Sequence, residues 1–341
     1  MQASPRPGAL VVSIDFELHW GTRDHTDASG VVARQLVASR QIVPRLADLF
    51  VERGVRATWA TVGFLFASSA EQLASFNPTL RPSYARRELD PYREPLGTDE
   101  EDDPVHFAGS LVDRLAAASG QEVASHTYSH YYCLEAGQDH AQFSADLAAA
   151  RAIAVSRGVA SRSLVLPRNQ WRADYAPAAH DNGFDCLRGP QPAWGHRPRR
   201  VDEEGPIVRA ARLADSYAGV RPPPTFAWDE IVESTGLCNV PASAFVRPFS
   251  PARRAIEPLR EARLRSGLRD ASRRGRIFHI WWHPHNFASH PAQSFGLLER
   301  LLDEFERLAV SDGIQSLAMG DVAEVLLGPP PPGREVGERT P

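Results

Sequence analysis

The chain has 341 residues, of which 43% are hydrophobic and 23% are charged, and its formal net charge is -4. This is the composition of a globular protein long enough for one large α/β barrel or two modest domains, and the charge gives no signature for binding nucleic acid. All 38 residues counted as Lys+Arg are arginines. Because no lysine amine is present, Schiff-base catalysis, pyridoxal-phosphate anchoring and a Walker-type phosphate lysine are excluded.

The N-terminal half alternates apolar strands with helices. Residues 9–14 are almost continuously apolar and rich in β-branched side chains, which predicts a buried strand of a parallel sheet that ends at Asp15. Apolar spacing predicts a helix over 32–53, ended by Gly54. Further strands are predicted at 55–64, 122–125 and 163–166, and further helices at 111–118 and 143–157. Residues 68–110 contain five prolines and the acidic run TDEEDD, which predicts a long surface excursion suited to be a lid.

The C-terminal half is less regular. Residues 190–250 are rich in Pro and Arg with little periodicity, and we treat them as a second irregular insertion. Residues 276–282 predict a strongly buried strand. A weak strand is predicted at 184–189, helices at 255–274 and 295–310, and a short strand at 314–319. The whole therefore predicts one barrel domain over 1–328 and a disordered, Pro-rich tail at 329–341.

Cysteines and apolar segments indicate the compartment. Cys133, Cys186 and Cys238 are odd in number and widely spaced, a pattern of free thiols rather than of a disulfide framework. No segment approaches the roughly 20 apolar residues that span a bilayer, and the start of the chain lacks the apolar stretch of a signal peptide. These features predict a cytoplasmic protein without a membrane span, and they leave its oligomeric state open.

Polar residues follow directly after several predicted strands. Because catalytic groups gather at the C-terminal ends of barrel strands, this arrangement favours a barrel over an open sheet. The residues are Asp15 and Glu17, His126 and His130, Arg168, and His283 and His285. His19 and His106 have no equivalent position, and His279, inside a strand, is expected to be a core histidine with satisfied hydrogen bonds.

The residue types at these positions indicate a metal. His126 and His130 are four residues apart, which suits two ligands of one ion in a helix or a tight turn. Asp15 and Glu17 share a face of an extended strand end, and one acid would complete a set of two imidazoles and one carboxylate. Burying such a cluster without a cation is costly, which argues against a purely structural role.

These motifs resemble those of the NodB-type polysaccharide deacetylases, which form carbohydrate esterase family four. The resemblance covers residues 8–325 and rests on SIDFE at 13–17, SHTYSH at 125–130, LPRNQ at 166–170 and FHIWWHPHNF at 278–287. It implies a distorted (β/α)7 barrel. It also implies a hydrolase that removes the N-acetyl group of an amino sugar or a glycan precursor, so that the expected partner is a carbohydrate with an acetamido group.

The resemblance implies a role for each residue. The expected metal ligands are Glu17, His126 and His130. The expected ion is Zn2+, with Co2+, Fe2+ or Ni2+ as alternatives. The expected catalytic residues are Asp15 as the base, His283 as the acid that protonates the leaving amine, and Arg168 as the group that keeps Asp15 ionised. Position and residue type, rather than the resemblance, suggest substrate contacts at Asn169, Gln170, Trp171 and His285, the last as a neighbour of His283. For Trp20, a platform for a sugar ring and ordinary packing are equal alternatives.

Two departures from the family pattern leave alternatives open. The usual first motif has adjacent acids, whereas Phe16 separates Asp15 from Glu17, so the chain is placed in a divergent Asp-x-Glu branch and the roles of the two acids can be reversed. The order of PRNQ at 167–170 is also reversed relative to the usual Arg and Pro-Tyr pair. Two other functions remain: an amidohydrolase acting on a non-sugar amide, cyclic imide or ureide, and a catalytically inactive glycan-binding protein.

Overall fold

A computed structural model describes residues 6–24, 30–218 and 223–329. The predicted disordered tail therefore lies, beyond residue 329, outside the described residues. No helix among the described residues has the length and apolarity needed to cross a membrane.

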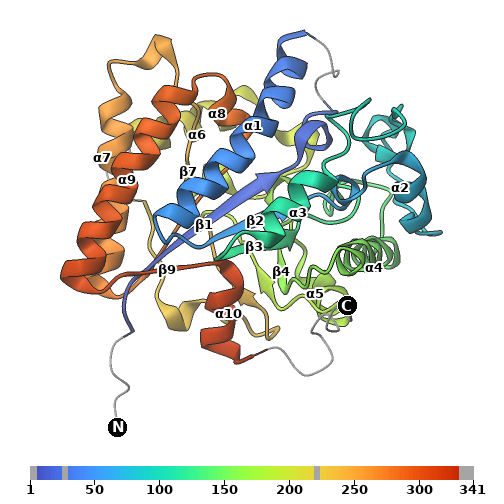
Figure 1. Cartoon of the computed structure of the whole chain (residues 1–341). Coiled ribbons are helices and arrows are strands. Elements are labelled where there is room, and N and C mark those ends of the chain that lie inside the picture. Colours follow the sequence, from blue (N-terminus) through green and yellow to red (C-terminus); the bar gives the residue numbers. More distant parts are fainter. Residues whose placement is uncertain (1–5, 25–29, 219–222, 330–341) are drawn as a thin grey trace.

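One parallel sheet, curled into a partial barrel, forms the centre of the fold (Figure 1). The strand order is β6-β5-β4-β3-β2-β1-β8-β7, and β9 pairs with β1. The strands are β1 (Ala9–Phe16), β2 (Ala57–Thr61), β3 (Gln121–Ser125), β4 (Ser163–Leu164), β5 (Cys186–Leu187), β6 (Cys238–Asn239), β7 (Ala244–Phe245), β8 (Ile277–Trp282) and β9 (Gln315–Leu317). Because these pairings are all parallel, the C-terminal ends of the strands lie at the same edge of the sheet.

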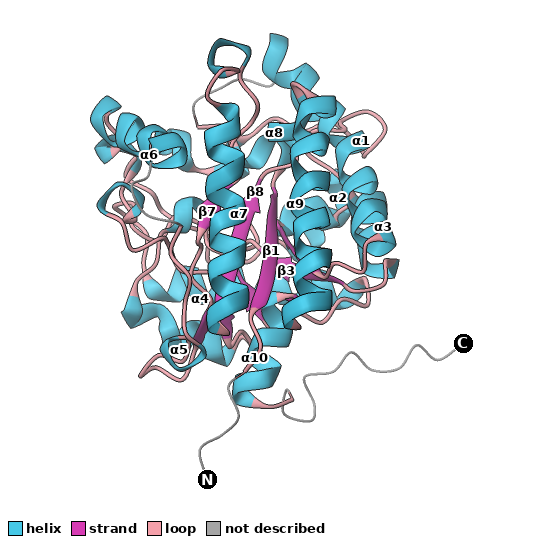
Figure 2. Ribbon diagram, turned by 90° about the vertical axis from the view of Figure 1, so that its left-hand side faces the viewer, coloured by secondary structure: helices cyan, strands magenta, loops and turns pink. Residues whose placement is uncertain are grey.

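Helices pack around the sheet (Figure 1). They are α1 (Gly30–Glu52), α2 (Ala70–Phe76), α3 (Gly109–Ala117), α4 (His140–Ser156), α5 (Ala176–Asp181), α6 (Pro206–Ala218), α7 (Glu257–Arg274), α8 (His285–Ala288), α9 (Pro291–Asp312) and α10 (Met319–Leu327). Figure 2 shows α7 and α9 covering β1 and β8. Gly267 lets α7 approach the sheet closely, because a Cβ atom there would lie 2.4 Å from the ring of Phe278 on β8.

The central strand β1 explains how the acids reach the inside of the barrel. Its eight residues are all buried, as the continuous apolar run predicted. Leu10 and Val12 pack toward the helices in the main core, whereas Ala9 and Val11 pack on the opposite face with residues of α10. Side chains alternate along a strand, so the parity of Ala9 and Val11 continues into Asp15. The same alternation that builds the core therefore turns the catalytic candidates inward.

The two expected insertions are packed parts of the fold. In 68–110, Leu89 and Phe107 are fully buried, so this excursion lies against the barrel. In 190–250 no helix or strand could be predicted from the sequence. The structure has the helix α6 and the strands β6 and β7 in this segment, so it is not wholly irregular. Two-residue strands are too short to leave a periodic pattern.

Candidate active site

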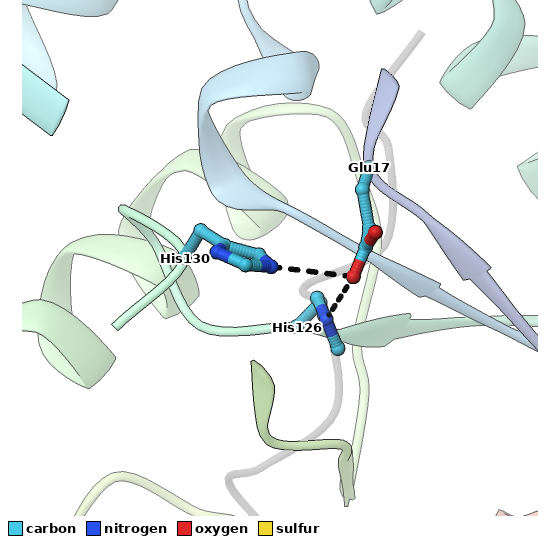
Figure 3. A group of neighbouring side chains, drawn as sticks. All are labelled: Glu17, His126 and His130. Atoms are coloured by element: carbon cyan, nitrogen blue, oxygen red, sulfur yellow. Dashed lines mark hydrogen bonds and ion pairs between the residues drawn. The ribbon is translucent and has the colours of Figure 1, made fainter. Parts of the chain in front are cut away.

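Three side-chain atoms of the kinds that bind metal ions converge beyond the C-terminal ends of β1 and β3. Glu17 Oε1 lies 2.8 Å from His126 Nε2 and 3.2 Å from His130 Nε2 (Figure 3). All three side chains are buried. We call this group the Glu17 cluster. Two imidazoles and a carboxylate whose donor atoms lie within 4.8 Å of one another fit the ligand set of a divalent metal, as the sequence predicted.

A tight turn, not a helix, places the two imidazoles. Thr127 and His130 have left-handed φ angles of 63° and 57°. Asp146 of α4 holds the turn, because its carboxylate accepts hydrogen bonds from the backbone N–H of Tyr128 at 2.7 Å and of Ser129 at 3.1 Å. Burial raises the pKa of Asp146 to about 7, although these hydrogen bonds act in the opposite direction. Sequence reasoning missed this residue, which lies in an Ala-rich helix.

Electrostatics sets the protonation states that a metal requires. Burial lowers the pKa of His130 to about 4, even though Glu17 favours its charged form. Burial alone would raise the pKa of Glu17, but the charge of His283 and the hydrogen bonds of His126 and His130 outweigh it and hold this pKa well below its usual range. An ionised carboxylate and a neutral imidazole are the forms that bind metal ions. The Nδ1 atoms of His126 and His130 are buried and have no hydrogen-bond partner among the described residues.

Arg188, and not Arg168, holds Asp15. The two Nη atoms of Arg188 donate to the two carboxylate oxygens of Asp15 at 2.6 and 2.7 Å, and both side chains are buried. Burial alone would raise the pKa of Asp15, but the charge and hydrogen bonds of Arg188, together with the charges of His126 and His283, outweigh burial, so this pKa is lowered. The expected role of Arg168 is thereby corrected, since Arg168 pairs with Asp24 instead. Arg188 follows β5 directly and enters the site from that strand end.

A hydrogen-bonded chain supports Arg188 from behind. Arg188 Nη1 donates to Ser13 Oγ at 3.0 Å, and the same oxygen lies 2.8 Å from His279 Nε2. His279 Nδ1 lies 3.1 Å from the carbonyl oxygen of Val240. This pattern fixes the neutral tautomer, in which Nδ1 donates to the carbonyl and Nε2 accepts from the Ser13 hydroxyl. Burial lowers the pKa of His279 to about 3, so His279 is the satisfied core histidine that the sequence predicted.

His283 faces both acids from the end of β8. Its Nε2 atom lies 3.5 Å from Glu17 Oε2 and 3.9 Å from Asp15 Oδ2. Its backbone N–H donates to Asn286 Oδ1 at 3.1 Å, and the ring of His285 stacks on it with centroids 4.9 Å apart. His283 remains 21% exposed, so its imidazole is accessible to a bound substrate.

The acids and His283 share one cavity of about 450 Å³. Asn169 and His285, two of the expected substrate contacts, line it together with Phe245, Trp281 and several arginines. Phe245 and Trp281 offer aromatic surface, which suits the apolar face of a sugar ring.

Three expected substrate contacts lie elsewhere. Trp20 is fully buried against Phe64 and donates through Nε1 to the carbonyl of His106, because it faces the core from the turn after β1. Gln170 is also fully buried and donates to the carbonyl of Arg199. Trp171 packs against a core cluster and does not line this cavity. For Trp20 the structure favours the packing alternative, and for Gln170 and Trp171 the expected substrate contact is corrected.

Comparison with known proteins gives a fold rather than a close relative. No family model matches the chain, and no curated protein matches it. Among solved structures, a candidate polysaccharide deacetylase from Mycobacterium smegmatis matches with a TM-score of 0.58 and 15% identity, over 96% of this chain and 92% of its own. A candidate polysaccharide deacetylase from Pseudomonas aeruginosa PAO1 matches with a TM-score of 0.54 and 13% identity, over 93% of this chain and 89% of its own. The chain therefore has the NodB-type polysaccharide deacetylase fold, which confirms the predicted distorted (β/α)7 barrel.

Proposed function

We propose that the protein is a metal-dependent hydrolase that removes the N-acetyl group of an amino sugar in a glycan or glycan precursor. The observation that carries this proposal is the placement of an ionised carboxylate, Asp15 clamped by Arg188, beside the Glu17 cluster and opposite His283 in one cavity. The fold shared with candidate polysaccharide deacetylases supports the choice of an acetylated glycan as substrate.

Glu17, His126 and His130 would hold the metal ion. Their buried, convergent donor atoms fit Zn2+, with Co2+, Fe2+ or Ni2+ as alternatives, and three protein ligands leave coordination positions for water and substrate. A divalent cation bound there supplies polarisation of the acetyl carbonyl and acidification of a water molecule.

The chain itself supplies the base and the acid. Asp15, ionised through Arg188, accepts a proton from the water whose oxygen forms a bond to the acetyl carbon. The bond between that carbon and the nitrogen then breaks, and His283 delivers a proton to the nitrogen, which leaves as a free amine while acetate forms. Without this proton the amine is a very poor leaving group. The contacts of Glu17 support Asp15 as the base. Because one oxygen of Glu17 contacts both imidazoles, Glu17 is placed as a metal ligand, and Asp15 is the remaining carboxylate.

Parallel assays on the zinc-loaded protein test this proposal. We expect acetate release from N-acetylglucosamine derivatives and no ring opening of cyclic imides. Asp15→Ala should lower the rate of acetate release about 10³-fold while zinc stays bound, because general acid and base catalysis contributes about 10² to 10⁴ in rate. Asp181→Ala, an exposed aspartate at the end of α5, serves as the control.

The other outcomes of these assays are equally definite. Ring opening without acetate release would show an amidohydrolase of non-sugar substrates. Glycan binding without any turnover in the metal-loaded protein would show an inactive carbohydrate-binding protein.

A further inference from the structure

A second group of histidines and carboxylates lies next to the Glu17 cluster. His19 belongs to the short 3-10 helix Leu18–Gly21 that follows β1, whereas Glu94, Asp103 and His106 belong to the 68–110 excursion. Glu94 Oε1 lies 3.1 Å from His19 Nε2 and 4.0 Å from His106 Nε2. The two rings meet edge to face, with centroids 5.0 Å apart. We call these four residues the His19 cluster.

Hydrogen bonding fixes which nitrogen of His106 carries a proton. Its Nδ1 atom lies 2.9 and 2.8 Å from the two oxygens of Asp103, and a carboxylate can only accept, so Nδ1 is the donor. In the neutral ring, Nε2 then presents a lone pair. This atom is buried and has no hydrogen-bond partner among the described residues. It lies 4.0 Å from a carboxylate oxygen of Glu94, which is also electron-rich, and a cation between the two atoms would satisfy both.

The geometry and the surroundings suit a zinc-like ion. Zinc binds nitrogen and oxygen ligands at about 2.0 to 2.1 Å with tetrahedral geometry, which places ligand atoms about 3.3 Å apart. The separations of 3.1 and 4.0 Å bracket this value, and the three donor atoms lie within 4.8 Å of one another. His19 and His106 are 1% and 5% exposed, and the Glu94 side chain is 25% exposed and gives an ion access from solvent.

Outer contacts also hold the ligands in place. Asp103 provides the carboxylate that commonly orients a metal-bound imidazole, and the hydroxyl of Thr22 lies 3.4 Å from His19 Nδ1. In addition, the backbone N–H of His19 donates to the carbonyl of Val105, so the two segments already touch.

We propose that His19, Glu94 and His106 form a second, structural site for a divalent zinc-like cation, separate from the Glu17 cluster. The ion would join the end of β1 to the 68–110 excursion. Because His19 is two residues from Glu17, the same link would also restrain the strand end that carries the catalytic candidates. This site does not depend on the proposed function, since it concerns metal content and not turnover.

The number of zinc ions per chain tests the proposal. The full chain is freed of metal with a chelator, reloaded with Zn2+ and separated from excess ion. Its zinc content per chain is then measured by elemental mass spectrometry. We expect two zinc ions per chain in the parent and one in Glu94→Ala. Glu88→Ala serves as the control, because Glu88 is an exposed carboxylate of the same segment that pairs with Arg86, and it should keep two ions.

Further variants separate the two sites. His126→Gln should keep one ion, and the combination of His126→Gln with Glu94→Ala should keep none. If Glu94→Ala fails to fold by circular dichroism, His106→Phe removes the ligand atom while keeping a ring against Trp20, and it should bind one ion. The proposal is overturned if the parent binds a single ion that His126→Gln abolishes, or if Glu94→Ala and His106→Phe bind as much zinc as the parent.

Discussion

Two groups with the same kinds of candidate metal ligands meet at the turn after β1, because Glu17 directly precedes this turn and His19 lies within it. The two groups differ in what surrounds them. The Glu17 cluster opens on a cavity and has a carboxylate held by Arg188 and the imidazole of His283 beside it. The candidate ligands of the His19 cluster do not line that cavity. Its His106 is instead held by a hydrogen bond to Asp103. From this contrast we infer a catalytic role for the Glu17 cluster, where open coordination positions, a candidate base and a candidate acid meet at a cavity, and a structural role for the His19 cluster.

The largest effect is expected from removing His283, the candidate acid that lies beside the Glu17 cluster and has no counterpart in the His19 cluster. His283→Gln should lower kcat for an acetamido sugar about 10³-fold, because the amine can no longer be protonated as it leaves. On 4-nitrophenyl acetate, whose leaving group needs no proton, the loss should be less than tenfold. Steady-state kinetics on both substrates measures the difference, and an equal loss on both would remove His283 from the acid role.

The next effect concerns the arginine that distinguishes this centre. Arg188→Gln should lower kcat/KM about 10² -fold at neutral pH, and it should move the acidic limb of the pH profile to higher pH. Arg188 holds the pKa of Asp15 low, so without it the base is protonated over a wider range of acidic pH. Arg168→Gln, whose side chain pairs with Asp24, is the matched comparison. A profile that shifts with Arg168→Gln and not with Arg188→Gln would contradict this assignment.

A smaller effect is expected in the outer contacts of the His19 cluster. Asp103→Asn should weaken zinc binding there about 30-fold, because removing the carboxylate behind a metal-bound imidazole typically lowers affinity 10- to 100-fold. The Glu17 cluster, whose imidazole Nδ1 atoms have no such partner among the described residues, should be unaffected. Competition with a chromophoric chelator measures both affinities. Equal weakening of both sites would show that they are not independent.

The smallest effect concerns a histidine that belongs to neither cluster. The pKa of His279 is about 3 in the folded state, against about 6.5 in an unfolded chain, so the unfolded state takes up a proton first as the pH falls. The stability that the neutral ring contributes is complete above pH 6.5 and decreases below it. Between pH 6.5 and 5.5 the parent should lose about 1 kcal/mol more than His279→Gln. Urea unfolding at the two pH values measures this, and identical losses would count against a buried neutral imidazole.

Long elements and strand-end motifs were predictable from the sequence. β1 and β8 appear as continuous apolar runs, and residues after such strands fall at one edge of a parallel sheet, so Glu17, His126, His130 and His283 were found together. Their apolar neighbours and their order along the chain carried the prediction of the barrel.

The remaining site residues leave no local signal. Arg188 follows a two-residue strand in a segment without clear periodicity, so its pairing with Asp15, 173 positions away, was not visible. Likewise, His19 meets Glu94 only because the 68–110 excursion folds back over the barrel, a contact across 75 positions that no spacing rule encodes. Contacts of this kind depend on the tertiary packing of irregular segments.

Acetate release by the zinc-loaded protein tests the central claim most directly. The parent should release one acetate for each free amine that it forms from an acetamido sugar. The control His140→Gln, which changes an exposed histidine on α4, should do the same. His126→Gln, which removes a ligand of the Glu17 cluster, should release neither. Turnover by His126→Gln at the rate of the parent, or no acetate from any acetamido sugar with the loaded parent, would contradict the assignment of a hydrolytic metal centre.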